Sequence, residues 1–275
     1  MTASVLIPAH NEADYLPACL DALLASDAAD VEVIIIANGC TDNTADIARS
    51  YAAPFEGKGW SFHVLDLAEG GKLGAWNAGE AAASGDTLIY LDADVIISAP
   101  LIGQIAQALQ GEAPRYASGT PNVTLSGQDA LTRHYTRFWE TIPFMTQGVP
   151  GFGVFAMNRA GRARWGAWPD IISDDTFARL SFAPSERVSV PATYDWPMIE
   201  GFKRLVQVRR RQEAGVAEIA ARYPAMMAQD DDHAAAVPTW QRAIGDPLAF
   251  ACYALVRLTV RLPVWRNTSR WARGR

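Results

Sequence analysis

Short apolar runs alternate with Ala-rich stretches of helical length in the first third of the chain. The apolar runs are residues 4–8, 31–37, 61–67 and 87–91, and the stretches between them are residues 13–25, 41–51 and 73–83. Strands buried on both faces of a parallel sheet have such continuous apolar sequences, and a helix commonly connects each strand to the next. The pattern therefore predicts an α/β fold with a mostly parallel, Rossmann-like central sheet and flanking helices.

The alternation is less regular after residue 94. We expect helices over residues 100–110 and 128–140, strands over residues 115–124 and 154–157, and a further helix opened by residues 173–175. An acidic, Ala-rich stretch at residues 229–238 is typical of a linker. We therefore predict a main domain of residues 1–228 and an extension of residues 229–275, formed by this linker and a C-terminal amphipathic helix with a basic tail.

Four motifs lie at the expected carboxyl ends of strands or at turns into helices. They are Pro-Ala-His-Asn-Glu at 8–12, Ala-Asn-Gly-Cys-Thr-Asp at 37–42, a Gly-Lys segment at 71–79 and Asp-Ala-Asp at 92–94. Ligands of open α/β sheets bind beyond the carboxyl ends of the strands, so these distant motifs should converge in space. Their glycines allow close approach of backbone to a ligand. Lys72 supplies a mobile cation for phosphate oxygens.

Asp92 and Asp94 follow the last of these strands, separated only by Ala93. Carboxylates bind hard ions such as Mn²⁺ or Mg²⁺ through oxygen and leave other coordination positions open for water and phosphate. Acidic residues after a strand also cap helices or end strand pairing, but the other three motifs favour a metal. We predict that Asp94, assisted by Asp92, binds a divalent ion that carries a nucleotide diphosphate.

Composition limits the possible partners and compartments. The chain has 275 residues, enough for an ample core, and three cysteines without metal-ligand spacing. No secretory leader is visible at the start, so we expect a cytoplasmic protein. The net charge of −6 argues against nucleic-acid binding, although the C-terminus is rich in arginine.

The four motifs, in this order, resemble those of inverting family 2 glycosyltransferases, which have the glycosyltransferase A fold. The resemblance covers residues 3–215. It implies an enzyme that moves a sugar from a nucleotide-diphosphate sugar to an acceptor hydroxyl, in the synthesis of polysaccharide, glycolipid or another cell-surface glycan. It also implies that Pro8, Ala9, His10 and Glu12 line the nucleotide site, where the ring at position 10 often packs against the base. The plain alternative for His10 is a polar residue at the entry to a helix.

One departure from the family concerns the nucleobase. Relatives usually have a carboxylate pair where this chain has Ala37 and Asn38, and the first carboxylate commonly reads the base. Alanine has no side-chain acceptor, so Asn38, Asp42 or backbone groups take over this contact. Thr41 and Asp42 are also suited to cap the following helix.

The pair Asp174 and Asp175 resembles the Glu-Asp motif of the family, whose carboxylate is the general base. The acceptor hydroxyl must lose a proton as it attacks the anomeric carbon, and a positioned carboxylate can accept it. Direct alignment makes Asp175 the base, whereas the short interval to Arg179 leaves Asp174 open. Carboxylates are also favourable at a helix N-terminus for structural reasons alone.

Further donor and acceptor contacts follow from the resemblance. Lys72, Asn77, Ala93 and one arginine of residues 209–211, taken as Arg209, would hold the donor, while the other two arginines lie in solvent. Gly151, Phe152 and Gly153 resemble the acceptor-side loop. Trp139 and Phe152 are candidates for stacking on a sugar, although most aromatic residues here belong to the core. His233, beside three aspartates, either caps the metal site or belongs to the charged linker.

The C-terminal run at residues 248–256 is apolar and is followed by Arg257 and Arg261 at helical spacing. It is too short to span a bilayer. It either packs against the catalytic domain or makes peripheral contact with a membrane surface, at the inner face of the membrane, with its arginines at anionic head groups.

Two other functions fit parts of the sequence. A sugar-phosphate nucleotidyltransferase has a similar sheet and metal requirement, but the first strand here lacks the Gly-rich nucleotide loop that such enzymes have. A non-catalytic nucleotide-sugar-binding relative would explain the missing base-reading carboxylate. The four clustered aspartates argue against it, because clustered carboxylates that serve no purpose repel one another.

Overall fold

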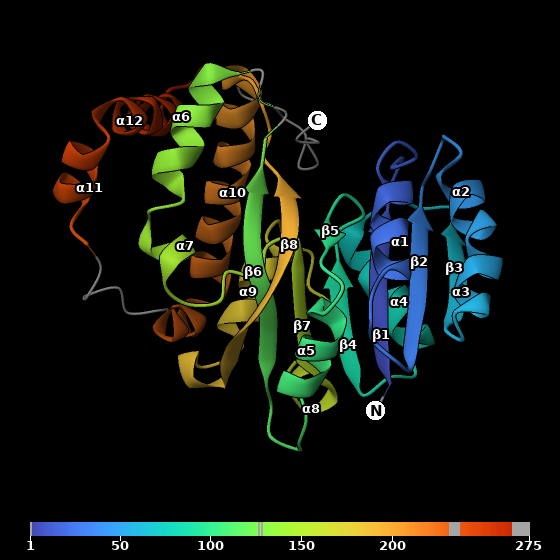
Figure 1. Ribbon diagram of the computed structural model, residues 1–275. Coiled ribbons are helices and arrows are strands. Elements are labelled where there is room, and N and C mark those ends of the chain that lie inside the picture. The colour runs from blue at the N-terminus through green and yellow to red at the C-terminus, as the bar shows by residue number, and fades with distance from the viewer. Residues whose placement is uncertain (1, 126, 128, 231–236, 266–275) are drawn as a thin grey trace. The chain divides into compact units, whose positions relative to one another are not determined.

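The computed structural model describes residues 2–125, 127, 129–230 and 237–265 (Figure 1). The chain divides into two compact units. The first comprises Met1–Asn122, Gly151–Asp170 and Ser185–Trp196, and the second comprises Val123–Pro150, Ile171–Pro184 and Pro197–Arg275.

The parallel part of the sheet lies in the first unit and has the predicted order of strands and helices. Its strands pair in the order β3-β2-β1-β4: β1 (Ala3–Ala9), β2 (Val31–Asn38), β3 (Ser61–Leu67) and β4 (Thr87–Leu91). The helices between them are α1 (Leu16–Leu24), α2 (Thr44–Ser50), α3 (Ala52–Gly57) and α4 (Lys72–Ala82). The alternation of apolar runs with helical stretches thus gives the expected α/β architecture.

Antiparallel strands extend this sheet. In the part of the chain that the structure describes, the sheet has eight strands in the order β3-β2-β1-β4-β7-β6-β8-β5. The added strands are β5 (Ile96–Ile97), β6 (Tyr116–Thr124), β7 (Val154–Asn158) and β8 (Arg187–Pro197). The pairs β4–β7, β6–β7 and β5–β8 are antiparallel. The sheet is therefore mixed.

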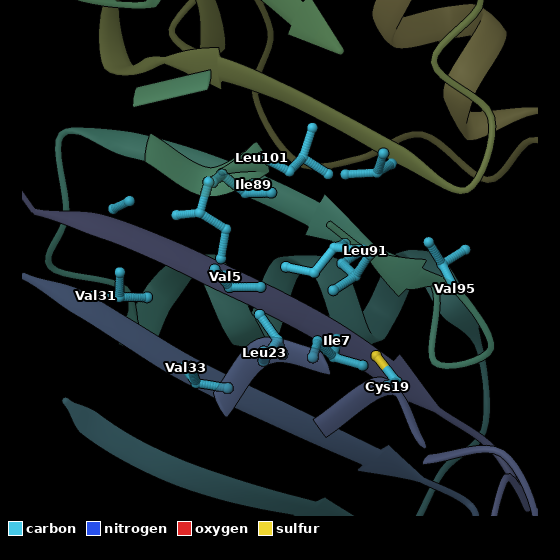
Figure 2. Close-up of a cluster of buried hydrophobic side chains, with 14 of the residues drawn as sticks. Val5, Ile7, Cys19, Leu23, Val31, Val33, Ile89, Leu91, Val95 and Leu101 are labelled. Atoms are coloured by element: carbon cyan, nitrogen blue, oxygen red, sulfur yellow. The ribbon is translucent and has the colours of Figure 1, made fainter. Parts of the chain in front are cut away.

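Both faces of the parallel strands are buried. Along β1, Val5 and Ile7 point into a cluster with Cys19 and Leu23 of α1 (Figure 2). On the opposite face α4 approaches so closely that a Cβ on its Gly79 would lie 2.9 Å from Ile36 and 3.4 Å from Leu6. Burial of each such aliphatic side chain contributes about 1.5–3 kcal/mol. The core thereby fixes the strand ends on which the motifs lie.

The remaining elements include short helices of the first unit and most of the second unit. The first unit contains α5 (Leu101–Ala108) and α8 (Arg159–Arg162). The 3₁₀ turn Pro184–Glu186 begins with the last residue of a segment of the second unit and continues into the first. The second unit contains α6 (Ala130–Trp139), α7 (Pro143–Thr146), α9 (Asp174–Leu180), α10 (Phe202–Arg222), the 3₁₀ turn Pro224–Gln229, α11 (Thr239–Gly245) and α12 (Pro247–Arg261). Asp246 starts α12 as its N-cap, accepting from the Ala249 amide at 3.1 Å.

Helix α12 packs on the second unit. Its Phe250 and Tyr253 rings lie 5.2 Å and 4.9 Å from the ring of Phe138 in α6. Arg210 of α10 donates to the carbonyls of Val260 and Leu262, at 3.0 Å and 2.8 Å, and so caps the end of α12. The expectation that Arg210 lies in solvent is therefore wrong, because the helix end supplies acceptors for its guanidinium.

The C-terminal extension is present in part. Helices α11 and α12 lie within it, while its division from residues 1–228 as a domain stays a prediction. Residues 231–236, which include His233, and the arginines of residues 266–275 lie outside the described residues. Across the described ranges, no helix has both the length and the hydropathy needed to cross a membrane.

Candidate functional site

The ends of β1 and β2 are joined by the side chain of Asn38. Its amide nitrogen donates to the carbonyls of Ala9 and Ile36 at 3.0 Å and 3.1 Å, and its amide oxygen accepts from the Gly71 N–H at 2.9 Å. The Nδ1 atom of His10 lies 2.6 Å from the Asn38 carbonyl oxygen. Asn38 is buried, and its side chain holds together three of the four motifs.

The loops after β2 and β3 touch at two glycines. Gly39 has φ of +58°, and a Cβ there would lie 2.6 Å from the amide nitrogen of Gly70. Only glycine fits both the backbone angle and this approach. A Cβ on Gly70 would lie 3.5 Å from the exposed His10 ring. The His10 ring and the Gly70 backbone therefore form one edge of this corner.

Asn11 is a site residue that the sequence reasoning missed. Its φ is +53°, and its Oδ1 atom accepts from the amides of Thr41 and Asp42 at 2.6 Å and 3.2 Å. The nearby Glu12 amide donates to the Thr44 hydroxyl at 2.8 Å. These bonds fix the turn after β2 against the end of β1. The signal in the sequence was the Asn itself, since asparagine tolerates positive φ better than other non-glycine residues.

Asp42 acts as a local cap. Its Oδ1 atom accepts from the Thr44 amide at 3.0 Å and from the Thr44 hydroxyl at 2.6 Å. Burial raises the pKa of Asp42, but the hydrogen bonds from Thr44 and from the Ala13 amide outweigh it and hold that pKa below its ordinary value. The carboxylate therefore stabilises the start of α2, the second of the two roles expected for it.

Lys72 and Asp92 form an ion pair at the end of β4. The Nζ atom lies 2.8 Å from Oδ1, and both side chains are about one-third exposed, at 28% and 32%. The Asp92 amide donates to the Gly153 carbonyl at 2.9 Å, and the Asp92 carbonyl accepts from the Val95 amide at 3.2 Å. This tight turn buries Ala93 and leaves Asp94 half-buried.

The aspartates of this turn suit a metal that takes most of its ligands from elsewhere. Among the described residues, no group of three or more His, Cys, Asp or Glu side chains is placed to hold an ion by itself. Mg²⁺ and Mn²⁺ are commonly held by one or two carboxylates together with substrate phosphates and water. Asp92 is paired with Lys72, and Asp94 follows two residues later in the same turn, so Asp94, assisted by Asp92, stays the predicted metal ligand. The donor set of oxygen atoms fits such an ion.

The acceptor-side loop is shaped by positive φ angles. Gly151 and Gly153 have φ of +70° and +76°, and a Cβ on Gly153 would lie 2.7 Å from the Trp196 ring. The ring centroid of Phe152 lies 4.8 Å from that of Trp196. Phe152 itself is only 8% exposed, whereas Trp196 is half-buried. Trp196, which the sequence reasoning did not select, is the more accessible aromatic residue here.

Asn77 and Glu80 anchor the segment that follows β7. The Oδ1 atom of Asn77 accepts from the Trp168 amide at 2.9 Å. One turn later in α4, Glu80 accepts from Tyr90 and from the Trp168 indole, both at 2.5 Å, and pairs with Arg162 at 2.6 Å. Sequence reasoning selected Asn77 but missed Glu80 and its partners, because these residues are distant in sequence.

The candidate base residues belong to the second unit. Asp174 and Asp175 are the first residues of α9, with Asp174 buried and Asp175 half-buried. The turn before them packs on α10, where a Cβ on Gly215 would lie 2.1 Å from the Ser173 hydroxyl. Glu218 of α10 accepts from the Ile172 amide at 2.9 Å. Helix α10 therefore holds the start of α9 in place.

Arg209 and Trp139, expected on the donor and acceptor sides, lie together in the second unit. The guanidinium carbon is 4.3 Å from the Trp139 ring centroid and 5.3 Å from that of Tyr135. Burial lowers the pKa of Arg209 from its ordinary value. Trp139 is only 5% exposed. In this arrangement the Trp139 face is a platform for Arg209, and its role toward a sugar stays a prediction.

Most of the expected site residues belong to the first unit. These are Pro8, Ala9, His10, Glu12, Asn38, Asp42, Lys72, Asn77, Asp92, Ala93, Asp94, Gly151, Phe152 and Gly153. Of them, Ala9 and Ala93 are buried, so that a contact with the donor would be made by their backbone. Trp139, Asp174, Asp175 and Arg209 are placed within the second unit.

Comparison with known proteins decides the family. Residues 4–165 match the sequence profile described as Glycosyl transferase family 2. The chain belongs to this family. The resemblance inferred from the four motifs is therefore confirmed. Family membership favours a glycosyltransferase over the nucleotidyltransferase and non-catalytic alternatives.

Curated relatives of this family 2 glycosyltransferase match over part of the chain. It is 33% identical over 110 residues to the uncharacterized glycosyltransferase alr2836 of Nostoc sp., which covers 40% of this chain and 33% of that protein. It is 38% identical over 91 residues to a PGL/p-HBAD biosynthesis glycosyltransferase of Mycobacterium bovis, with 33% and 34% covered. The matches span about a third of the length of these two relatives.

Solved structures show the glycosyltransferase A fold. The mannosyltransferase PcManGT from Pyrobaculum calidifontis, in complex with GDP-Man and Mn²⁺, has a TM-score of 0.63 at 19% identity and covers 95% of this chain and 76% of its own. TarS of S. aureus, in complex with UDP-GlcNAc, has a TM-score of 0.52 at 16% identity, with 73% and 60% covered. The predicted fold class of this family 2 glycosyltransferase is confirmed.

Proposed function

We propose that this family 2 glycosyltransferase moves a sugar from a nucleotide-diphosphate sugar to an acceptor hydroxyl, with inversion of the anomeric centre and with a divalent metal ion. The observation that supports the proposal most directly is the Lys72–Asp92 pair at the end of β4, with Asp94 two residues further on. The ammonium of Lys72, from α4, is thereby held at the turn after β4 that contains both carboxylates. Neighbouring structures in complex with UDP-GlcNAc, and with GDP-Man and Mn²⁺, support the donor class.

The β1–β2 corner is the proposed nucleotide site. The exposed His10 ring lies next to the Gly70 backbone and would pack against the base. Asn38 uses both amide hydrogens within the protein, and Asp42 accepts hydrogen bonds from its own helix. Base recognition therefore falls to backbone groups of these loops, with Asn38 and Asp42 as positioning residues.

Asp94 and Asp92 would hold the metal, and Lys72 would bind diphosphate oxygens beside them. When bound, the ion would offset the charge that develops on the leaving diphosphate. Lys72 is well placed to add to this effect, because its ammonium already lies against the acidic turn. The chain itself thus supplies a fixed positive group at the point where the leaving group gains negative charge.

Asp175 is the proposed general base. It would accept the proton of the acceptor hydroxyl during a single displacement, which inverts the anomeric centre. Asp175 is more exposed than Asp174, so it is the better placed of the two to meet an acceptor. Trp196 and the glycines at 151 and 153 would shape the acceptor side. The acceptor proposed here is a hydroxyl of a polysaccharide, a glycolipid or another cell-surface glycan.

The test is transfer or donor hydrolysis measured with Mn²⁺ and with Mg²⁺ for Asp94→Ala. We expect activity to fall at least about 100-fold, since metal stabilisation of a leaving group is worth several kcal/mol. The matched control is Asp86→Ala, an exposed aspartate just before the amino end of β4. Full activity of Asp94→Ala would overturn the metal assignment, whereas equal losses in both variants would show a general effect of the substitution.

A further inference from the structure

Helix α12 has two apolar faces. One face contains Val256 and Val260 and packs on the rest of the second unit. The other presents Leu248, Leu255 and Leu258 to solvent, with exposures of 57%, 47% and 61%. The intervening exposed position on this face, Ala251, is also apolar. Spacings of three and four residues place these side chains along one line of the helix.

Exposed apolar side chains also occur beyond both ends of α12. In α11, Trp240 and Ile244 are 62% and 70% exposed, and after α12 come Leu262 and Trp265 at 53% and 41%. We call the exposed side chains of residues 240, 244, 248, 251, 255, 258, 262 and 265 the C-terminal stripe. Contiguous exposed apolar side chains commonly mark a surface that binds a protein or a membrane.

Positive charge accompanies the C-terminal stripe. Residues 237–275 contain seven arginines and one acidic residue, although the whole chain has a net charge of −6. That acidic residue, Asp246, caps α12 and pairs with Arg137 at 2.6 Å. Arg257 is paired with Glu213, whereas Arg261 is exposed beside Leu262. The segment that carries the stripe therefore contributes basic groups, and its one carboxylate is already paired with an arginine.

The start of α10 adds to this basic region. The Phe202 ring lies 5.7 Å from the Trp265 ring, which brings the first turn of α10 to the end of the stripe. Lys203 and Arg204, the next two residues of α10, are exposed. Tryptophan, aliphatic and basic side chains thus occur together at this end of the second unit. This is the composition of helices that lie in a lipid interface.

We propose that the C-terminal stripe docks on the surface of an anionic lipid bilayer. The leucines and Trp240 enter the boundary between head groups and acyl chains, and Arg261, Lys203 and Arg204 contact lipid phosphates. Helix α12 has 15 residues, too few to span a bilayer, so it lies parallel to the surface. A symmetric contact with a second copy would bring the same basic groups together, which disfavours that occupant.

The experiment measures binding of the full-length protein to vesicles. Phosphatidylcholine vesicles are compared with vesicles that also contain phosphatidylglycerol, by flotation at low and high salt. We expect binding to the anionic vesicles only, weakened at high salt because surface charges are screened. Leu255→Glu combined with Leu258→Glu should weaken binding at least about tenfold, because two exposed apolar anchors become anionic.

The matched control adds the same charge elsewhere. Ala53→Glu combined with Ala82→Glu changes two exposed alanines of α3 and α4 in the first unit, and should bind vesicles like the unchanged protein. Equal vesicle binding by the Leu255/Leu258 variant and its control would overturn the proposal, as would the absence of binding to anionic vesicles. A dimer in light scattering that the Leu255/Leu258 variant loses would show that a second copy covers the stripe, and would also overturn it. Vesicle binding requires no sugar donor, so its outcome is independent of the proposed reaction.

Discussion

The ammonium of Lys72 lies 2.8 Å from a carboxylate oxygen of Asp92, so the first residue of α4 is joined to the first residue after β4. The pair fixes one carboxylate of the acidic turn and holds a cation at the end of β4. Because both partners are partly exposed, the pair itself adds little to stability. We expect the pair to contribute instead to the binding of the nucleotide diphosphate.

Replacement of Lys72 should therefore weaken nucleotide binding. In Lys72→Met we expect the Kd for a nucleoside diphosphate with Mn²⁺ to rise about 10- to 100-fold, since a charge-assisted contact to phosphate is lost. Isothermal titration calorimetry measures this change. Lys72→Arg keeps the charge and should retain most of the affinity. An unchanged Kd in Lys72→Met would show that the lysine serves only its ion pair with Asp92.

Two glycines of the site should respond oppositely to alanine. Gly39→Ala forces a Cβ to within 2.6 Å of the Gly70 amide at a positive φ, so we expect a loss of about 2–4 kcal/mol in the free energy of unfolding. Gly74→Ala lies in α4 with open space around its Cβ and should gain about 0.5–1 kcal/mol. Chemical denaturation of both variants tests the pair. Similar values for the two would contradict the close contact of the loops.

Substitution of the two acidic residues at the start of α9 should separate catalysis from stability. In Asp175→Asn we expect kcat to fall about 10²- to 10⁴-fold without a change in donor affinity, because the proton acceptor is lost. In the buried Asp174→Asn the main effect should be on the free energy of unfolding. Steady-state kinetics, calorimetry with donor and thermal unfolding measure these effects. A loss of kcat confined to Asp174→Asn would transfer the role of base to Asp174.

Acid sensitivity should arise in part from Glu32 of β2. Burial raises the pKa of Glu32, but hydrogen bonds from Ser4 and Ser84 outweigh it and hold that pKa below its ordinary value. The folded protein thus favours the ionised carboxylate. Its stabilising contribution is fully present above the unfolded-state pKa, near 4.5, and is lost as the pH falls through the lower pKa of the folded state.

Glu32→Gln should accordingly flatten the acid side of the stability profile. We expect this variant to be less stable by about 1–3 kcal/mol at neutral pH and to converge toward the unchanged protein in acid. Urea denaturation at several pH values gives the comparison. Glu56→Gln changes an exposed glutamate of α3 and should leave the profile as it is. A constant difference between Glu32→Gln and the unchanged protein at every pH would contradict the assignment.

The parallel half of the fold could be predicted because its information is local. Each strand from β1 to β4 is a continuous apolar run, and each connection is a stretch of helical length, so periodicity and burial agree. The four motifs could be expected to converge for the same reason, since parallel strands end at one edge. The antiparallel pairing of β4 with β7 joins strands that are more than sixty residues apart. A local sequence pattern cannot predict such a pairing.

Side-chain partners in the site could not be predicted. Asn38 was one of three candidates for base recognition, beside Asp42 and backbone groups. The sequence did not indicate that its amide bonds to Ala9, Ile36 and Gly71, which meet only after the sheet has formed. Arg210 was expected in solvent and caps α12 instead. In both cases the residue type showed hydrogen-bonding capacity, whereas the partner depended on tertiary packing.

Helix α10 braces two regions of the second unit at once. Near its middle, Arg210 donates to the terminal carbonyls of α12. More than one turn later, Gly215 and Glu218 contact the residues that precede Asp174. Residues 210 and 218 are separated by about 12 Å along a rigid helix axis. If the leucines of α12 bind a lipid surface, the rigid helix α10 would therefore hold the α9 carboxylates at a fixed distance from the lipid head groups.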